Sequence, residues 1–279
     1  MIVNFLIILI LIGLVVASIW DLKKREIPDW LNFSLIAIAL FTRLIFSFLE
    51  KDISFFVSGV IYFAIFFVIA HLFYYARIFA GGDAKLLIVL GIVFAEPPKL
   101  IISSLIPSAF VFILNLLIVG AFYGLFFLII YTWKNKTSFY KEFKRTNKKV
   151  PLPYLLLCLA FVLGAIILKN WFWILFSFLI ILLYYLYLIA KISEKVALIQ
   201  EITSDKLTEG DWLAQTVKIG NKEIKPTWDG LSKKDIALLR KEKKKVLIRQ
   251  GIPFVPAFLI AFIITLLLGN VFEIIMALF

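Results

Sequence analysis

The chain has 279 residues, of which 63% are hydrophobic, and a formal net charge of +12. Soluble domains are about 45–50% apolar, so this composition excludes an ordinary soluble protein and indicates a polytopic membrane protein. The basic residues gather in a few loops between apolar segments, which argues against a nucleic-acid-binding surface. The single cysteine, Cys158, lies in an apolar run, so neither an internal disulfide nor a cysteine-based zinc cluster is expected.

Eight apolar segments are candidates for transmembrane helices, each of which needs roughly 20 residues to span. They are 2–20, 31–49, 53–76, 85–95, 101–133, 153–168, 171–190 and 252–278. The fourth segment is short, and the fifth is long, with Pro107 near its start, where a helix is expected to break. The first segment has no basic stretch before it and no small-residue cleavage site. It is therefore expected to be a retained transmembrane helix and not a signal peptide that is removed. The sequence therefore predicts an all-α polytopic membrane protein with about eight transmembrane helices, one of them short.

The loops on alternate sides of these segments differ in their basic residues. One set holds the basic stretches 23–25 and 134–149 and the polar region 191–249. The other set holds only Lys51, Lys99 and Lys169. Because Lys and Arg favour cytoplasmic loops, the first set is expected in the cytoplasm and the protein in the cell membrane.

Residues 193–250 interrupt the membrane pattern. Val217–Ile219 and 222–225 flank Gly220 and Asn221, which predicts a β-hairpin. Ser232 is expected to cap a helix, with Asp235 at its third position. This region is therefore predicted to be a small α+β cytoplasmic domain before the last helix. Four parts are expected in the chain: a catalytic transmembrane core over 1–133, a basic cytoplasmic loop with a helical hairpin insertion over 134–192, the small domain over 193–250, and a C-terminal transmembrane helix over 251–279.

Two aspartates lie at the boundaries of apolar segments. Asp21 ends the first segment, and Asp83 follows a glycine pair before the fourth. An ionisable group at this depth is costly, which makes both residues functional candidates. Two such carboxylates at one membrane face suggest an acid–base pair that activates water. The alternative is a structural ion pair of Asp83 with Lys85 or Arg77.

The residues around both aspartates resemble known motifs. The segment 21–32 contains Asp21, a basic stretch, Ile-Pro-Asp and the start of a second helix, and resembles the first catalytic motif of type IV prepilin peptidases. The segment 81–86, Gly-Gly-Asp-Ala-Lys-Leu, is similar to their Gly-x-Gly-Asp-x-Lys motif, although Ala80 replaces the first glycine. The polar region and the segment 251–256 resemble the archaeal preflagellin (archaellin) branch.

This resemblance implies an intramembrane aspartyl protease with Asp21 and Asp83 as the catalytic pair. One ionised carboxylate would act as base on a shared water, and the protonated one would polarise the scissile carbonyl. The expected substrates are prepilin-like or preflagellin precursors, which carry a short positively charged leader that is removed at the cytoplasmic face. Membrane lipids are also expected partners, whereas no metal or other cofactor is implied. The expected substrate-binding or positioning residues are Gly81, Gly82, Pro28, Asp29 and Lys85.

Other interpretations remain open at this point. A transporter could use the two aspartates as an ion or proton site, and a presenilin-like protease also uses a Gly-x-Gly-Asp motif. Lys85 could instead extend to lipid headgroups. Among other polar residues, Arg43 is expected to extend to the membrane surface, His71 to be buried against a neighbouring helix, and Asn115 to bridge helices.

Overall fold

The computed structural model describes residues 2–96, 106–146, 150–170, 172–219, 222–227, 230–243, 245–249 and 251–277. They form two compact units, Met1–Leu125 with Ile252–Phe279, and Phe126–Gly251. The expected turn at Gly220 and Asn221, the loop residue Lys99 and the expected helix ends at 101, 171 and 278 lie outside the described residues.

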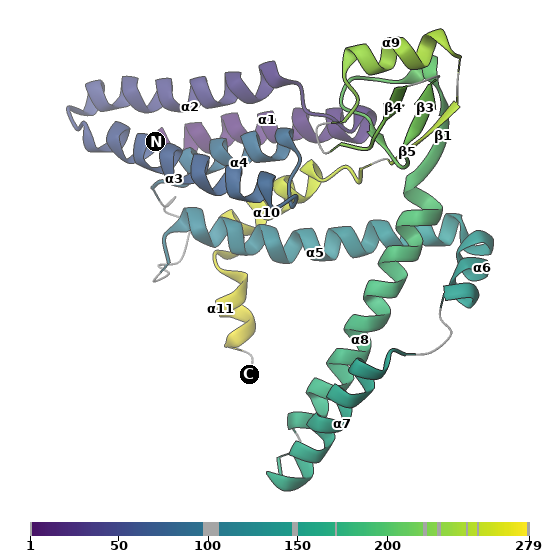
Figure 1. Cartoon of the computed structure of the whole chain (residues 1–279). Coiled ribbons are helices and arrows are strands. Elements are labelled where there is room, and N and C mark those ends of the chain that lie inside the picture. The colour runs from purple at the N-terminus through teal and green to yellow at the C-terminus, as the bar shows by residue number, and fades with distance from the viewer. Residues whose placement is uncertain are drawn as a thin grey trace. The chain divides into compact units, whose positions relative to one another are not determined.

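The first unit is helical (Figure 1). It contains α1 (Ile2–Lys24), α2 (Asp29–Glu50), α3 (Ser54–Tyr75), α4 (Gly81–Val93), the first part of α5 (Ser108–Lys134), α10 (Val255–Leu268) and α11 (Val271–Met276). At its centre is α4, whose residues from Leu86 to Val93 are all buried. A helix that is apolar on all sides has no water-facing stripe and must be buried, either in lipid or among other helices. Helices α1, α2 and α3 pack against α4.

The second unit combines helices with two small sheets. Its helical part contains the end of α5, α6 (Lys136–Thr146), α7 (Leu152–Ile167) and α8 (Phe172–Ser193), which continues into a short π-helical turn (Glu194–Leu198). In the first sheet, β5 (Lys245–Arg249) lies between β1 (Ile199–Thr203) and β2 (Trp212–Leu213), and all pairs are antiparallel. In the second, β3 (Val217–Ile219) pairs with β4 (Lys222–Ile224), which confirms the two strands of the predicted hairpin.

A single helix completes the small domain. Helix α9 (Lys233–Lys241) is capped as expected, because the Ser232 hydroxyl accepts a hydrogen bond from the Asp235 amide at 3.2 Å. Buried leucine, isoleucine and valine side chains from α9, the strands and the connecting loops form a separate hydrophobic core. The α+β character of this region is thereby confirmed.

Five described helical segments are long and apolar enough to cross a membrane, which identifies a multi-pass membrane protein. They are Asn4–Lys24, Asp29–Glu50, Ser54–Tyr75, Ser108–Lys134 and Phe172–Val196. Helices α7 and α10 are apolar but shorter. The count of eight spanning helices stays a prediction.

Two expected helix boundaries were wrong. The fourth helix begins at Gly81 rather than at residue 85, so Asp83 lies in its first turn. The last apolar segment forms α10 and α11 rather than one helix. The break lies at Gly269, whose positive φ of 69° suits a residue without a side chain, and Asn270 then caps α11 by accepting a hydrogen bond from the Phe272 amide.

The expectations for Arg43 and His71 were also wrong. Arg43 is fully buried and donates hydrogen bonds to the Phe55 carbonyl at 2.7 Å and the Ser58 hydroxyl at 3.1 Å, so it does not extend to the surface. The first turn of α3 supplies these acceptors inside the protein. His71 is exposed, and its Nδ1 lies 2.8 Å from the Phe67 carbonyl of its own helix rather than against a neighbouring helix.

Asn115 bridges helices as expected. Its amide nitrogen donates to the Thr265 hydroxyl at 2.9 Å and to the Gly269 carbonyl at 2.7 Å. Its carbonyl oxygen accepts a hydrogen bond from the Val271 amide at 3.1 Å. Asn115 therefore hydrogen-bonds backbone groups on both sides of the break between α10 and α11. These bonds hold the end of the last apolar segment against α5.

Candidate active site

Asp21 lies in the last turn of α1 and is buried. Its Oδ2 accepts a hydrogen bond of 2.8 Å from the backbone amide of Val255, the first residue of α10. The first amides of a helix have no partner within the helix, and the partial positive charge of that end attracts a carboxylate. The N-terminus of α10 therefore fixes the position of the Asp21 carboxylate.

Asp83 is the third residue of α4 and is partly exposed. Its Oδ2 accepts a hydrogen bond of 3.3 Å from the Ala80 amide, which precedes the helix. Among the described residues, its Oδ1 has no hydrogen-bond partner. One oxygen of this carboxylate is therefore held by the backbone, while the other can bind a water or a substrate group.

The two carboxylates lie at the same end of the first unit. The segments that carry them also meet: the ring of Phe79 lies 5.8 Å from that of Phe254 and 5.5 Å from that of Phe258, between centroids. The starts of α4 and α10 are thus packed together through aromatic side chains.

The segment after Asp21 contacts the turn before Asp83 at two points. Asn32, which is fully buried in α2, donates from Nδ2 to the Gly82 carbonyl at 3.3 Å. A Cβ atom at Gly82 would lie 3.2 Å from the Ile27 Cβ, which is a tight contact. A side chain at position 82 would therefore crowd Ile27, and the two motifs pack closely where a glycine leaves room.

An ion pair also joins the two motifs. The Lys85 ammonium lies 2.5 Å from Oδ1 of Asp29, the first residue of α2, and 5.1 Å from the centre of the Phe33 ring. Lys85 therefore pairs with Asp29, which differs both from an ion pair with Asp83 and from extension to headgroups. Pro28 precedes α2 in an extended conformation, with φ −60° and ψ 134°, and sets the direction in which that helix begins.

Gly81 differs from Gly82 in its surroundings. A Cβ atom at Gly81 would approach only the Tyr74 ring, at 3.9 Å. Space is therefore open beside Gly81, next to Asp83, whereas Gly82 is packed against the first motif. The two glycines of the motif thus have different structural roles.

Two contributors to the site had no assigned role in the sequence analysis. Asn32 could have been identified from its position, because it is a polar residue one turn after Asp29 in an otherwise apolar helix face. The amide of Val255 left no such sign, because a backbone group is present at every position except proline.

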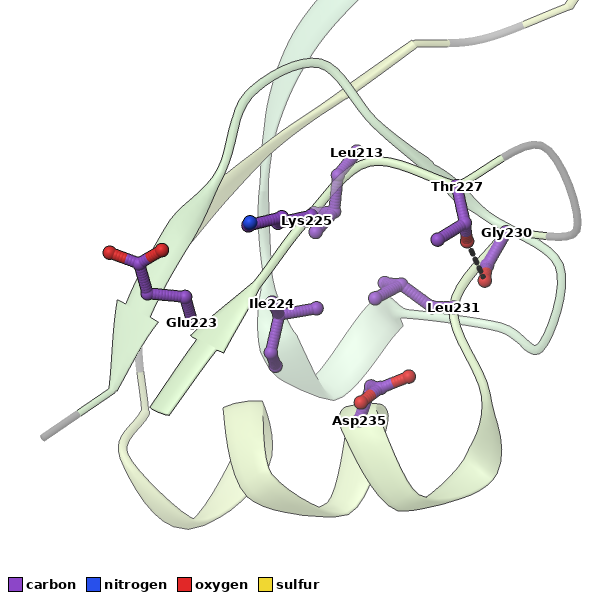
Figure 2. A pocket seen from close by; sticks show the side chains of 8 residues that line it. All are labelled: Leu213, Glu223, Ile224, Lys225, Thr227, Gly230, Leu231 and Asp235. Carbon is purple, nitrogen blue, oxygen red and sulfur yellow. Dashed lines mark hydrogen bonds between the residues drawn. The ribbon is translucent and has the colours of Figure 1, made fainter. Parts of the chain in front are cut away.

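A cavity of about 250 Å³ lies in the small domain, away from these motifs in sequence (Figure 2). Its floor includes Leu213, Ile224 and Leu231. Three of the polar side chains that line it have partners: Asp235 bonds to Ser232, the Thr227 hydroxyl donates to the Gly230 carbonyl at 3.0 Å, and Glu223 pairs with Lys218. We assign no chemistry to this cavity.

Comparisons with known proteins agree with the motifs. Residues 8–133 match the type IV leader peptidase family, and this range contains both Asp21 and Asp83. Over 80 residues, the chain is 34% identical to a preflagellin peptidase of Methanocaldococcus jannaschii. The aligned region covers 29% of this chain and 34% of that relative, so the chain covers about a third of the relative's length. The predicted resemblance to prepilin and preflagellin peptidases is confirmed.

Proposed function

We propose that this protein is a membrane aspartic endopeptidase that removes the short, positively charged leader of prepilin-like or preflagellin precursors. The observation that carries this proposal is that the segment after Asp21 and the turn before Asp83 pack together, through the Asn32–Gly82 hydrogen bond and the Lys85–Asp29 ion pair. Asp21 and Asp83 are more than sixty positions apart in the sequence, and each has a carboxylate oxygen held by a backbone amide.

The two carboxylates would activate a water molecule between them. With one carboxylate ionised and the other protonated, the ionised group takes a proton from the water as its oxygen attacks the scissile carbonyl carbon. The protonated group donates its proton to the carbonyl oxygen. When the tetrahedral intermediate collapses, one of its hydroxyl groups gives a proton to the carboxylate that is now ionised, the C–N bond breaks, and the departing amine takes the proton held by the other carboxyl group. The roles belong to the pair, because the two titrations are coupled.

The residues around the pair would position the substrate and the aspartates. The open space beside Gly81 admits an extended substrate backbone next to Asp83. Asn32 holds the Gly82 carbonyl, and the Lys85–Asp29 ion pair joins the starts of α4 and α2. These contacts would restrict the motion of the Asp83 turn, as catalysis by a positioned group requires.

The site would lie at the cytoplasmic face of the cell membrane. This placement rests on the excess of Lys and Arg in the loop after Asp21 and in the stretch 134–149. A precursor could then place its apolar segment against the enzyme within the bilayer while its basic leader stays in the cytoplasm.

Incubation with candidate substrates tests this proposal. The purified full chain in detergent is mixed with a panel of preflagellin and prepilin precursors, and the products' N-termini are read by mass spectrometry. A single cut between the basic leader and the apolar segment is the expected result. A matched precursor without its basic leader serves as the control. If every precursor stays intact while the chain drives proton uptake in proteoliposomes, the transporter alternative replaces the peptidase.

A further inference from the structure

Helix α6 follows directly from a membrane-spanning helix. Helix α5 ends at Lys134 and α6 begins at Lys136, so a single residue separates them. This residue, Asn135, donates from its side chain to the Tyr131 carbonyl at 3.1 Å, and its own carbonyl accepts from the Phe139 amide at 2.9 Å. From the sequence only a basic loop is expected here. The short, hydrogen-bonded joint instead places α6 next to the end of α5, a helix long and apolar enough to cross a membrane.

One face of α6 is already covered by protein. Phe139 and Phe143 are half-buried, and their rings stack with centroids 5.8 Å apart. Glu142 on the same face accepts a hydrogen bond of 3.1 Å from Lys195, which lies just beyond α8. Helix α6 contacts α8 on this side. Phe139 and Phe143 are therefore packed within the second unit and are not free to insert into a bilayer.

The opposite face of α6 is basic and exposed. At about 100° per residue, one half of the helix circumference carries the exposed Thr137 and five exposed side chains that are basic or aromatic. These five are Lys136, Tyr140, Lys141, Lys144 and Arg145. We call these residues the α6 basic face. Arg145 also lies 3.5 Å from Glu142, but its side chain stays largely exposed.

We propose that the α6 basic face binds the phosphate headgroups of anionic phospholipids, with α6 lying along the membrane surface. Three features favour a lipid surface over an acidic protein. The face adjoins the end of a spanning helix, where headgroups are present at high local concentration. Tyr140 on this face and Trp133 near the end of α5 are exposed, and both residue types favour the membrane–water interface. Clusters of Lys and Arg next to a spanning helix are attracted to anionic leaflets.

Lipid titration tests this inference without any peptide substrate. The full chain in a neutral detergent is titrated with dioleoyl phosphatidylglycerol or dioleoyl phosphatidylcholine, and bound lipids are counted by native mass spectrometry. The wild-type chain should bind the anionic lipid in preference to the neutral one. A triple variant, Lys136→Gln with Lys141→Gln and Lys144→Gln, should lose that binding about tenfold or more, because each cation near the surface contributes to the attraction.

Two controls keep the result interpretable. Lys206→Gln with Lys222→Gln and Lys234→Gln removes the same charge from exposed positions of the small domain, and should change binding by no more than about twofold. A triple Lys→Arg variant of the α6 basic face keeps the charge and should bind as the wild type does. Equal binding of both lipids by the wild type would overturn the inference. An equal loss in both triple Gln variants would also overturn it, because general charge attraction would then suffice.

Discussion

Replacement of Asn32 tests how the Asp83 turn is held. Asn32 is fully buried, and its only described hydrogen bond as a donor is the 3.3 Å bond to the Gly82 carbonyl. Asn32→Ala removes that donor. A hydrogen bond of this kind contributes about 0.5–1.5 kcal/mol. If the whole loss falls on the transition state, cleavage slows by about 2- to 13-fold.

Asn32→Asp separates a hydrogen-bonding role from simple packing. The carboxyl group has nearly the same shape as the amide, but it can donate to the Gly82 carbonyl only when protonated. When ionised it repels that carbonyl and adds a negative charge near Asp83. The ratio of the Asn32→Asp rate to the wild-type rate should therefore rise as the pH falls.

The assay measures precursor processing by matched amounts of wild type, Asn32→Ala and Asn32→Asp between pH 5 and 8. The Asn32→Ala rate should stay in constant proportion to the wild-type rate across this range, because alanine does not titrate. A ratio for Asn32→Asp that is flat, or that falls toward low pH, would refute the hydrogen-bonding role.

Three further predictions concern the contacts around the site. Gly82→Ala should lower thermal stability in detergent by about 1–3 kcal/mol, because its methyl group would crowd an isoleucine side chain, whereas Gly81→Ala should leave stability unchanged. Asp29→Asn and Lys85→Met should each reduce kcat/KM, with a coupling of only about 0.2–1 kcal/mol in a double-mutant cycle because the pair is partly exposed. Fully additive losses would exclude the ion pair. Asn115→Leu should lower thermal stability by about 2 kcal/mol, since it removes three hydrogen bonds worth about 0.6 kcal/mol each. An unchanged melting temperature would contradict this assignment.

The sequence predicted those features that depend on local order along the chain. The cap at Ser232, the two strands at 217–219 and 222–224, and the apolar spans follow from residue preference and periodicity. Motif order also indicated the resemblance to leader peptidases. Each of these signals is carried by residues close together in sequence.

The errors concern residues whose surroundings come from distant segments. Arg43 is buried because the first turn of α3 supplies acceptors, which its own helix does not reveal. The break between α10 and α11 is held by Asn115, more than 150 positions earlier. The hydrogen bond from the Val255 amide to Asp21 also joins distant segments. It could not be predicted from the sequence, because almost every residue has a backbone amide.

The central claim is that Asp21 and Asp83 act together in hydrolysis. The most direct measurement is precursor processing by matched amounts of Asp21→Asn, Asp83→Asn and the double variant, with each protein shown to be folded in membranes. An amide is nearly isosteric with a carboxyl group but cannot take up and release the required proton, so each single variant should be inactive and the double variant no worse. Asp52→Asn changes an exposed aspartate outside the site and should process precursors normally. Substantial cleavage by either Asp21→Asn or Asp83→Asn would contradict the account.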